Sequence, residues 1–265
     1  MPTTINGIGT QYYGRKNPRV YGGICESCQR HVTLTDYETG YYVVVLFIPV
    51  IPLGKKQIIG ECSACRRHRV MPLKEWERIK EENLENGLAS LADNMDDPSK
   101  ALELLQSMTV FNQLDEAMEL AAATAKQHAK DFDTLIDIGS WYERQGQTEL
   151  SNRCFDQAIA LDPAHPTSKR IQGVDALQSG NPNEAAKHFE PLRKSADFYD
   201  PSLFYMLAGA YQAKEMHEEA LEEFKDLLVR IPEFGKDKEF RKAVKKSEKA
   251  IGSPTSILPK KGLFG

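Results

Sequence analysis

The chain has 265 residues with 41% hydrophobic and 27% charged side chains, the composition of an ordinary globular protein that builds its own core. Its first residues are polar and show no apolar segment of a secretory leader. The longest apolar run, 41–53, contains two prolines that would break a spanning helix. We therefore expect a cytoplasmic protein without a membrane-spanning helix.

The net charge of −4 conceals an uneven distribution along the chain. Residues 1–75 carry a net charge of +5 and residues 236–265 one of +6, whereas residues 76–235 carry −15. The basic ends either bind an anionic partner or contact the acidic centre. Because Glu-rich helical surfaces are common, a solvated acidic face is the simpler interpretation of the centre.

The segment before the first cysteine, residues 1–20, is rich in glycine and aromatic residues. It lacks the signature of a phosphate-binding loop, and no helical pattern follows it. We expect an N-terminal arm that packs in an extended conformation on the module that follows.

Four of the five cysteines form two C-x-x-C pairs, Cys25 with Cys28 and Cys62 with Cys65. Without a secretory leader, two such pairs indicate a metal site rather than disulfides. Four thiolates complete a tetrahedron and leave no open position, so the site is expected to be structural. Two alternatives stay open: iron in a rubredoxin-like site, and redox or electron-transfer chemistry at the cysteines.

Three further residues that could bind a metal are not expected to be ligands. His31 and His68 each follow the second cysteine of a pair by three residues, but four thiolates already suffice as ligands. Cys154 stands alone in a helical pattern, where a small buried apolar side chain is the default.

Between the pairs the chain has strand composition, and residues 21–72 resemble the bacterial-type zinc-ribbon family, whose "FFIPLxPLG" strand matches Val45–Lys56. The resemblance implies one structural zinc held by Cys25, Cys28, Cys62 and Cys65, and no reaction. Zinc knuckles usually have proline after the first cysteine and glycine after the second. This chain instead has Glu26, Gln29, Ser63 and Arg66, which puts the knuckle turns in doubt.

The apolar strand 41–53 is apolar on both of its alternating faces, and a small ribbon covers only one. Four covers are conceivable: the N-terminal arm, the helical region, another molecule or a membrane flanked by Lys55 and Lys56. We favour the arm, because it carries Tyr12 and Tyr13, and we regard membrane contact as the weakest of the four.

A 34-residue period links Gly139 to Gly173, Gly146 to Gly180 and Phe155 to Phe189. The units resemble the tetratricopeptide repeat, with about four helix pairs over residues 98–235. Residues 73–97 are expected to form a helical linker, and residues 236–265 a basic capping helix and a flexible tail. The predicted fold is mainly α, a tetratricopeptide-type α-solenoid with a small N-terminal β zinc ribbon.

The repeat resemblance implies a concave groove lined by the first helix of each unit, which holds a protein or peptide partner. The matching positions are Gln106, Val110, Ser140, Glu143, Arg144, Arg170, Val174, Gln178, Tyr205 and Gln212. The carboxylate clamp of chaperone-binding repeats is absent from the corresponding positions, so chaperone-tail binding is not predicted.

No catalytic motif is found, and both expected modules are commonly non-catalytic. We therefore predict a non-enzymatic interaction or scaffold protein. The first alternative is nucleic-acid association through the ribbon and the basic tail. Lys55, Lys56, Arg66, Arg67 and Arg69 supply a small basic patch for it, which an acidic array would oppose. The second alternative is redox or electron transfer at the four cysteines.

Overall fold

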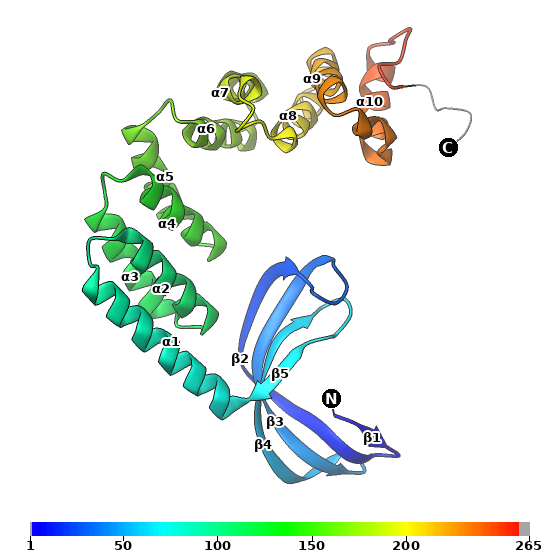
Figure 1. The fold of residues 1–265 in the computed structure, drawn as a ribbon. Helices are drawn as coiled ribbons and strands as arrows, with labels where there is room; N and C mark the ends of the chain where they lie inside the picture. Colours follow the sequence, from blue (N-terminus) through cyan, green and yellow to red (C-terminus); the bar gives the residue numbers. More distant parts are fainter. Residues whose placement is uncertain (1, 260–265) are drawn as a thin grey trace. The chain divides into compact units, whose positions relative to one another are not determined.

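The computed structural model describes residues 2–259, and the chain divides into two compact units, Met1–Gln127 and His128–Gly265 (Figure 1). The first unit contains an antiparallel sheet followed by three helices, and the second consists of helices. The boundary between the units falls after the third helix, inside the region expected to be repeats. None of the helices in the described range is long and apolar enough to cross a bilayer.

The sheet of the first unit has five strands in sequence order, each antiparallel to the next. They are β1 (Thr4–Ile5), β2 (Ile8–Ile24), β3 (His31–Val45), β4 (Ile48–Cys62) and β5 (Arg69–Pro72). The three central strands are 15 to 17 residues long, so the sheet is larger than the small ribbon expected from the sequence.

The expected N-terminal arm is a full strand of this sheet. Strand β2 pairs with β3 from Gly9, opposite Val44, to Ile24, opposite His31, so a boundary at residue 20 falls inside a strand. The register shifts between Tyr13 and Arg19, and these irregularities interrupt the two-residue alternation that identifies a strand in a sequence. The arm pairs with the edge of β3 as a neighbouring strand, so it does not lie over a face of the apolar strand 41–53. The expectation that the arm covers that strand is therefore wrong.

Three helices complete the first unit: α1 (Leu73–Asp93), α2 (Pro98–Val110) and α3 (Leu114–Gln127). The guanidinium of Arg19 in β2 donates to the carbonyl of Val110 at 3.0 Å. The rings of Trp76 and Phe111 lie 5.1 Å apart, which joins α1 to the end of α2. These contacts attach the helices to the sheet within this unit.

The second unit contains α4 (Phe132–Arg144), α5 (Thr148–Leu161), α6 (Pro166–Gln178), α7 (Pro182–Lys194), α8 (Pro201–Ala213), α9 (His217–Arg230), a 3₁₀ turn η1 (Pro232–Lys236) and α10 (Lys238–Ala250). Helices pack in the consecutive pairs α4–α5, α6–α7 and α8–α9. Aspartates cap several N-termini, as Asp131 does by accepting from the amide of Thr134 at 2.9 Å.

The glycines of the 34-residue period have two physical roles. Gly173 faces the ring of Phe189, where an added Cβ would lie 2.1 Å from the ring, so only glycine permits the close approach of α6 and α7. Gly146 and Gly180 adopt φ 72° in the turns that end the first helix of a pair. Asn112 and Glu215 occupy the corresponding turns of the flanking pairs with φ 58° and 61°.

The core of the second unit is a continuous apolar cluster from α7 to the residues after α10. Phe189, Phe204, Phe224 and Phe240 are nearly fully buried in it. Phe240 belongs to α10, so the expected capping helix does cover the last pair. The expected flexible tail is wrong up to residue 259, because Leu258 is buried in the same cluster. The last six residues of that tail lie outside the described range.

Candidate metal centre and repeat groove

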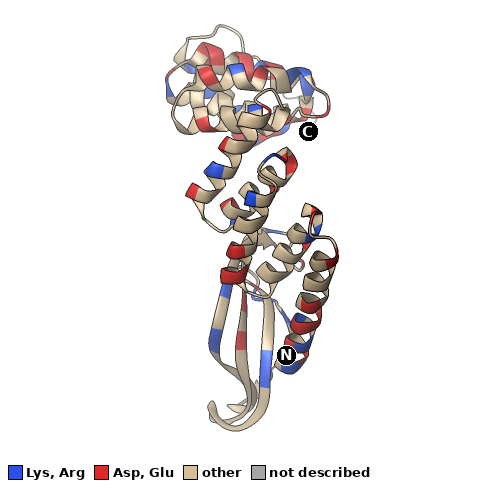
Figure 2. Cartoon of the chain, turned by 90° about the vertical axis from the view of Figure 1, so that its left-hand side faces the viewer, with Lys and Arg blue, Asp and Glu red and all other residues tan. Residues whose placement is uncertain are grey.

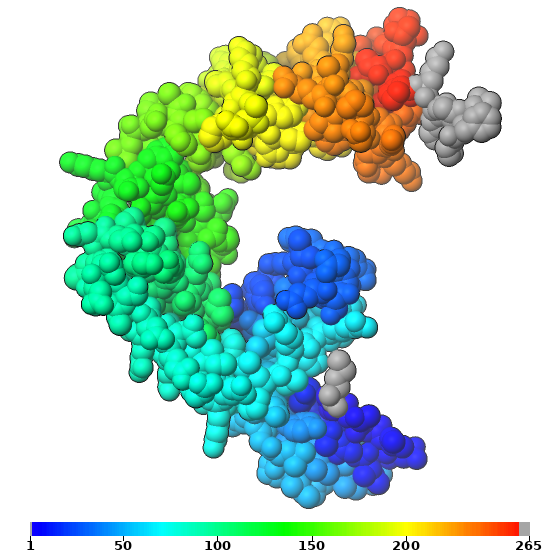
Figure 3. Space-filling view, viewed as in Figure 1, coloured from blue at the N-terminus to red at the C-terminus, as the bar shows by residue number. Residues whose placement is uncertain are grey.

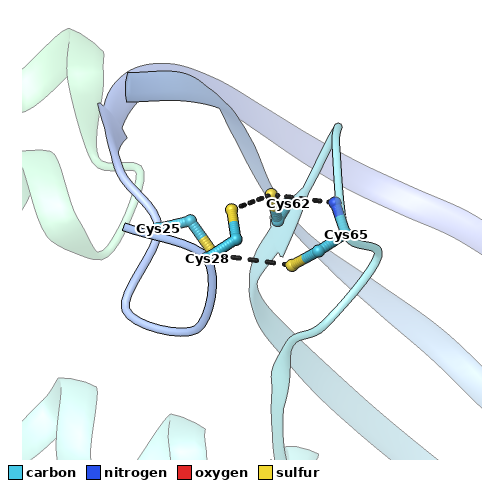
Figure 4. Close-up of side chains that lie close together, drawn as sticks. All are labelled: Cys25, Cys28, Cys62 and Cys65. Carbon is cyan, nitrogen blue, oxygen red and sulfur yellow. Dashed lines mark hydrogen bonds between the residues drawn. The ribbon is translucent and has the colours of Figure 1, made fainter. Parts of the chain in front are cut away.

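The four predicted ligand cysteines come together at one end of the sheet. Cys25 follows β2 and Cys62 ends β4, and a tight turn after each brings in Cys28 and Cys65 (Figure 4). The four sulfur atoms lie within 4.8 Å of one another, and all four thiols are free. In the described part of the chain, this is the cluster of side chains able to hold a metal ion.

The sulfur positions can be tested against a metal-centred tetrahedron. The Sγ atoms of Cys25 and Cys65 are 3.6 Å apart, and those of Cys28 and Cys62 are 3.9 Å apart. A tetrahedron with metal–sulfur bonds of about 2.3 Å has edges of about 3.8 Å. These two distances match the edges of such a tetrahedron, whereas a disulfide would require sulfurs about 2 Å apart.

The two cysteine turns have the same backbone geometry. The amide of Cys25 donates to Arg30 and that of Cys62 to Arg67, both at 3.0 Å. The residue after the second cysteine is left-handed in each, with φ 55° at Gln29 and 60° at Arg66. Glycine is favoured in this conformation, which accounts for its usual place in such turns, and Gln29 and Arg66 adopt the same conformation here.

Backbone amides prepare one of the thiols for ligation. The amides of Cys65 and Ala64 each lie 3.3 Å from the Sγ of Cys62. The hydrogen bond from Cys65 contributes most, and together they lower the pKa of Cys62 to about 6. Such bonds favour the thiolate, which is the form that binds a metal.

The two nearby histidines do not join the cysteine cluster. His31 is exposed, and Nδ1 of His68 lies 3.2 Å from the carbonyl of Arg66. The ring of His68 packs edge-on against Tyr12 with centroids 6.1 Å apart.

A polar cluster beside Cys62 was not predicted from the sequence. Arg15 of β2 forms a 2.9 Å ion pair with the buried Glu61 and lies 4.4 Å over the ring of Tyr37. Burial, followed by the hydrogen bond to Glu61, raises the pKa of Tyr37 to about 12. The cluster joins the three central strands next to a ligand cysteine. Its members are far apart in sequence and follow no motif, so no sequence signal identifies them.

The second unit contains a hollow of about 730 Å³ between the first helices of its first two pairs and the start of α5. Five of the predicted groove residues line it: Ser140, Glu143, Arg170, Val174 and Gln178. Eight other lining residues were missed: Ile136, Thr148, Ser151, Asn152, Phe155, Thr167, Ile171 and Asp175. Ile136 and Ile171 could have been found from helical spacing. Ile136 lies four residues before Ser140 and Ile171 three residues before Val174, so each shares a helical face with a predicted residue.

The remaining predicted groove residues have other surroundings. Gln106 and Val110 belong to α2 in the first unit, and Arg144 is exposed but does not line the hollow. The Nε2 of Gln212 donates to the carbonyl of Ala243 at 2.7 Å and to Ser247, both in α10. Tyr205 stacks on Phe240 with ring centroids 6.0 Å apart. Helix α10 therefore occupies the last part of the expected groove.

The charges around the hollow are unevenly compensated. Arg170 lies 3.5 Å from Asp200, which compensates its charge. Burial, with a smaller effect of Asp156, raises the pKa of Asp175, and no ion pair within residues 2–259 involves Asp175 or Glu143. The lining thus combines half-buried apolar side chains with two carboxyl groups that have no cationic partner.

Comparison with known proteins identifies the repeat. Residues 132–165, which form α4, α5 and the following turn, match the tetratricopeptide repeat family, as predicted. No curated protein sequence matches the chain. This match supports a scaffold for protein–protein interaction.

Among solved structures, MamA (AMB-1) aligns with a TM-score of 0.46 and 17% identity over 58% of this chain and 82% of that one. A tetratricopeptide repeat protein from Parabacteroides merdae aligns with a TM-score of 0.48 and 16% identity over 68% and 71%. The Cut9–Hcn1 hetero-tetramer of the APC/C aligns with a TM-score of 0.44 and 16% identity over 64% and 34%.

Proposed function

We propose that the protein is a non-catalytic adaptor whose repeat groove, the hollow lined by α4, α5 and α6, binds a short segment of a protein partner. The observation that carries the proposal is the composition of this hollow. Apolar side chains of Ile136, Ile171 and Val174 lie among polar groups at the mouth of a concave site. Concave sites of this kind anchor one or two side chains of a peptide.

The charges favour one class of peptide. Glu143 and Asp175 have no cationic partner, whereas the cation of Arg170 already faces Asp200. We therefore infer that the preferred segment carries an apolar side chain next to a Lys or Arg. The apolar group would replace water on Val174, and the cation would pair with the two carboxylates.

We further propose that the four cysteines hold one structural zinc ion. When bound, the ion would cross-link the ends of β2 and β4, and four thiolates would leave it no position for substrate. Zinc and iron both accept four thiolates, so the metal is identified by elemental analysis. Iron with its visible absorbance would favour the electron-transfer alternative.

The nucleic-acid alternative has a weaker basis. Two cations of the small basic patch are engaged, Arg66 with Glu61 at 3.4 Å and Arg69 with Glu26 at 3.1 Å. The three that remain, Lys55, Lys56 and Arg67, are few compared with the phosphate contacts of a duplex-binding surface. Fluorescence anisotropy with labelled single-stranded and duplex DNA at several salt concentrations tests this alternative directly.

The groove is tested by selecting peptides from a phage-displayed library on the full chain and measuring their affinity by fluorescence polarisation. We expect the selected peptides to combine an apolar residue with Lys or Arg. Val174→Arg should weaken them about tenfold or more, because it places a cation on the apolar surface of the groove. Val229→Arg is the matched control, since Val229 is exposed on α9 outside the groove.

Two results would overturn the groove proposal. The first is peptides that bind Val174→Arg as tightly as the unchanged chain. The second is peptides that lose affinity equally with the Val229→Arg control. Glu143→Lys should lose affinity for the selected cationic peptides and gain affinity for peptides in which Glu replaces the cation. This pair of results would establish the charge preference.

A further inference from the structure

The sheet carries an apolar tip at its far end from the cysteines. We define this tip as residues 4–13 and 40–54, which comprise β1, the start of β2 and the turn joining β3 to β4. Six of its large side chains are between 47% and 70% exposed: Leu46, Phe47, Ile48, Val50, Ile51 and Leu53. The dark blue and light blue atoms at the bottom of Figure 3 show this end of the sheet clear of α1.

The exposure affects both faces of the sheet and the turn itself. Consecutive residues of β4 in regular register, such as Ile51 and Pro52, are both exposed, although neighbouring side chains of a strand point to opposite faces. Leu46 and Phe47, at the end of the turn, are exposed as well. A protein partner lying on one face would leave the other in water, whereas an apolar medium surrounding the tip would cover both.

Charge is absent from the whole tip. Residues 4–13 and 40–54 contain no Asp, Glu, Lys or Arg, and Figure 2 shows the lower end of the sheet without blue or red. Exposed patches of this size are rare on a protein surface that faces only water.

The strand register places tyrosines at the inner end of the tip. Tyr12 pairs with Tyr41 across β2 and β3, with Tyr42 one step toward the turn and Tyr13 one step away from it. Lys55 lies in the layer of Tyr13, since both pair with Gly40, and Lys56 lies one step further, opposite Thr39. An apolar end, a belt of tyrosines and then lysines is the order of side chains that suits the passage from hydrocarbon to anionic headgroups.

The lysines of this layer are available for headgroups. Lys16 and Lys55 are exposed, and Lys56 lies 5.9 Å from the ring centre of Tyr41. None of the three forms an ion pair within the described residues, whereas Arg15 and Arg19 of the same strands are engaged with Glu61 and Asp36. Glu38, opposite Lys16 in the strand register, is an acidic residue of the same layer, and its Oε1 accepts from Asn17. Three lysines against this carboxylate leave a net positive charge next to the tip, complementary to an anionic surface.

Part of the backbone of the tip is paired within the tip, which matters in an apolar medium, where an unpaired amide or carbonyl is costly. In the turn, the amide of Phe47 donates to Gly7 at 3.0 Å, and the hydroxyl of Tyr13 donates to the carbonyl of Phe47. The outer edge of β4 is unpaired over residues 48–55, and Pro49 and Pro52 reduce the number of amide hydrogens in this stretch. The same prolines oppose the addition of a further strand from another protein or a second copy.

We propose that the apolar tip inserts into one leaflet of an anionic lipid bilayer, with the tyrosines at the interface and the lysines on anionic headgroups. The apolar part of β4, residues 48–54, extends over about 23 Å, which is shorter than the hydrocarbon thickness of about 30 Å. The tip therefore anchors the protein to a surface and does not span it. The proposal is independent of the repeat groove and of the identity of the metal.

The test uses the full chain and vesicles of phosphatidylcholine with about 30% phosphatidylserine, compared with phosphatidylcholine alone. We expect the protein to float with the anionic vesicles in a density gradient. Phe47→Asp and Leu46→Asp should each reduce binding about tenfold or more, because each removes a large inserted side chain. Both positions are left-handed, a conformation that Asp tolerates, so these variants should keep the fold.

Val20→Asp is the matched control, because Val20 is 64% exposed in the same sheet but outside the tip. It should bind anionic vesicles like the unchanged chain, with circular dichroism verifying all variants. Lys55→Glu combined with Lys56→Glu should weaken binding to anionic vesicles and remove most of the preference over neutral ones.

Three results would overturn the proposal. The unchanged chain could fail to float with either kind of vesicle. The tip variants could bind as well as the Val20→Asp control. Light scattering could show a dimer that Phe47→Asp dissociates, with no vesicle binding by the unchanged chain, which would identify a second copy as the occupant of the tip.

Discussion

The sheet of the first unit and the helices of the second unit are stabilised in different ways. Few large apolar side chains are fully buried in the sheet, chiefly Val44 and Ile58, and they lie among buried polar groups such as Asp36 and Glu61. The helical unit has one continuous apolar cluster that includes four phenylalanines. The sheet therefore depends on specific cross-links, and the helices depend on packing.

This difference in stabilisation corresponds to different proposed roles for the sheet and the helical unit. A sheet with many of its apolar residues on an exposed tip requires another means of fixing its opposite end, which a metal ion held by the four cysteines would supply. The helical unit buries a continuous apolar cluster from α7 to the residues after α10. The comparison predicts that changes in the two regions affect different measurements, and the predictions below are ordered from the largest expected effect to the smallest.

Removing the proposed metal is the strongest test of this difference. A chelator, or the substitution Cys62→Ser, should unfold the cysteine end of the sheet, because metal binding to four thiolates contributes on the order of 10 kcal/mol to folding. Limited proteolysis should then cut within residues 25–69, while the helical circular dichroism signal of the second unit stays. A chain that keeps its protease resistance without metal would show that the sheet is stable by itself.

Cys154→Ser is the matched control for this experiment, because Cys154 is buried in α5 and is not a ligand. It should leave the metal content unchanged and lower only the stability of the helices. Loss of metal with this variant would contradict the assignment of the four ligands.

The second prediction concerns the packed core of the helices. Phe224→Ala and Tyr142→Ala should each destabilise the helical unit by about 3–5 kcal/mol, since both side chains are nearly fully buried. Arg170→Glu should change stability little, because the Arg170 side chain is 58% exposed. Thermal melts followed at the helical signal distinguish these classes, and equal melting temperatures for Phe224→Ala and Arg170→Glu would refute the assignment.

The repeat region was the part of the fold that sequence reasoning predicted best. Its period is fixed by local requirements, such as Gly173 beneath a phenylalanine ring and Gly180 in a left-handed turn, and each recurs where the geometry recurs. Helices α4 and α5 form one of the helix pairs expected over residues 98–235. The cysteine cluster was equally predictable, because two identical spacings imply one common centre.

Local sequence patterns did not predict strand β2, nor the packing of α10 over the last part of the expected groove. The bulges around Lys16 disrupt the alternation of β2, and its pairing with β3 depends on residues about thirty positions away. Gln212 occupies a groove position of the repeat, but its hydrogen bonds to α10 depend on where that helix packs. Tyr205 was expected to face solvent in the groove, and its stacking on Phe240 instead makes it part of the cap.

The third prediction compares two glycines of the helical unit. Gly173→Ala should destabilise it by about 1–3 kcal/mol, because the new methyl group would overlap the ring of Phe189. Gly209→Ala in α8 has open space at this position and should instead stabilise the unit by about 0.5–1 kcal/mol, since alanine favours helices. Chemical denaturation measures both. The same sign of change for the two variants would contradict the close contact between α6 and α7.

The smallest expected effects concern the left-handed residues that occur in both regions. Glu215 ends α8 with φ 61° and Arg66 ends a cysteine turn with φ 60°, and glycine adopts this conformation without the strain of a side chain. Glu215→Gly should therefore stabilise the helical unit by about 1 kcal/mol. Arg66→Gly should stabilise the cysteine end by a similar amount, because its 3.4 Å ion pair with Glu61 involves a largely exposed guanidinium and contributes little.

The two glycine variants should be detected by different probes if the regions fold separately. Glu215→Gly should raise the midpoint of helical unfolding, and Arg66→Gly should raise the chelator concentration needed to expose residues 25–69 to protease. Lys214→Gly, one residue before Glu215, is the control. Lys214 has φ −97°, which a residue with a side chain adopts without strain, so glycine relieves no strain at this position. If Lys214→Gly stabilised as much as Glu215→Gly, the gain would not come from the left-handed turn.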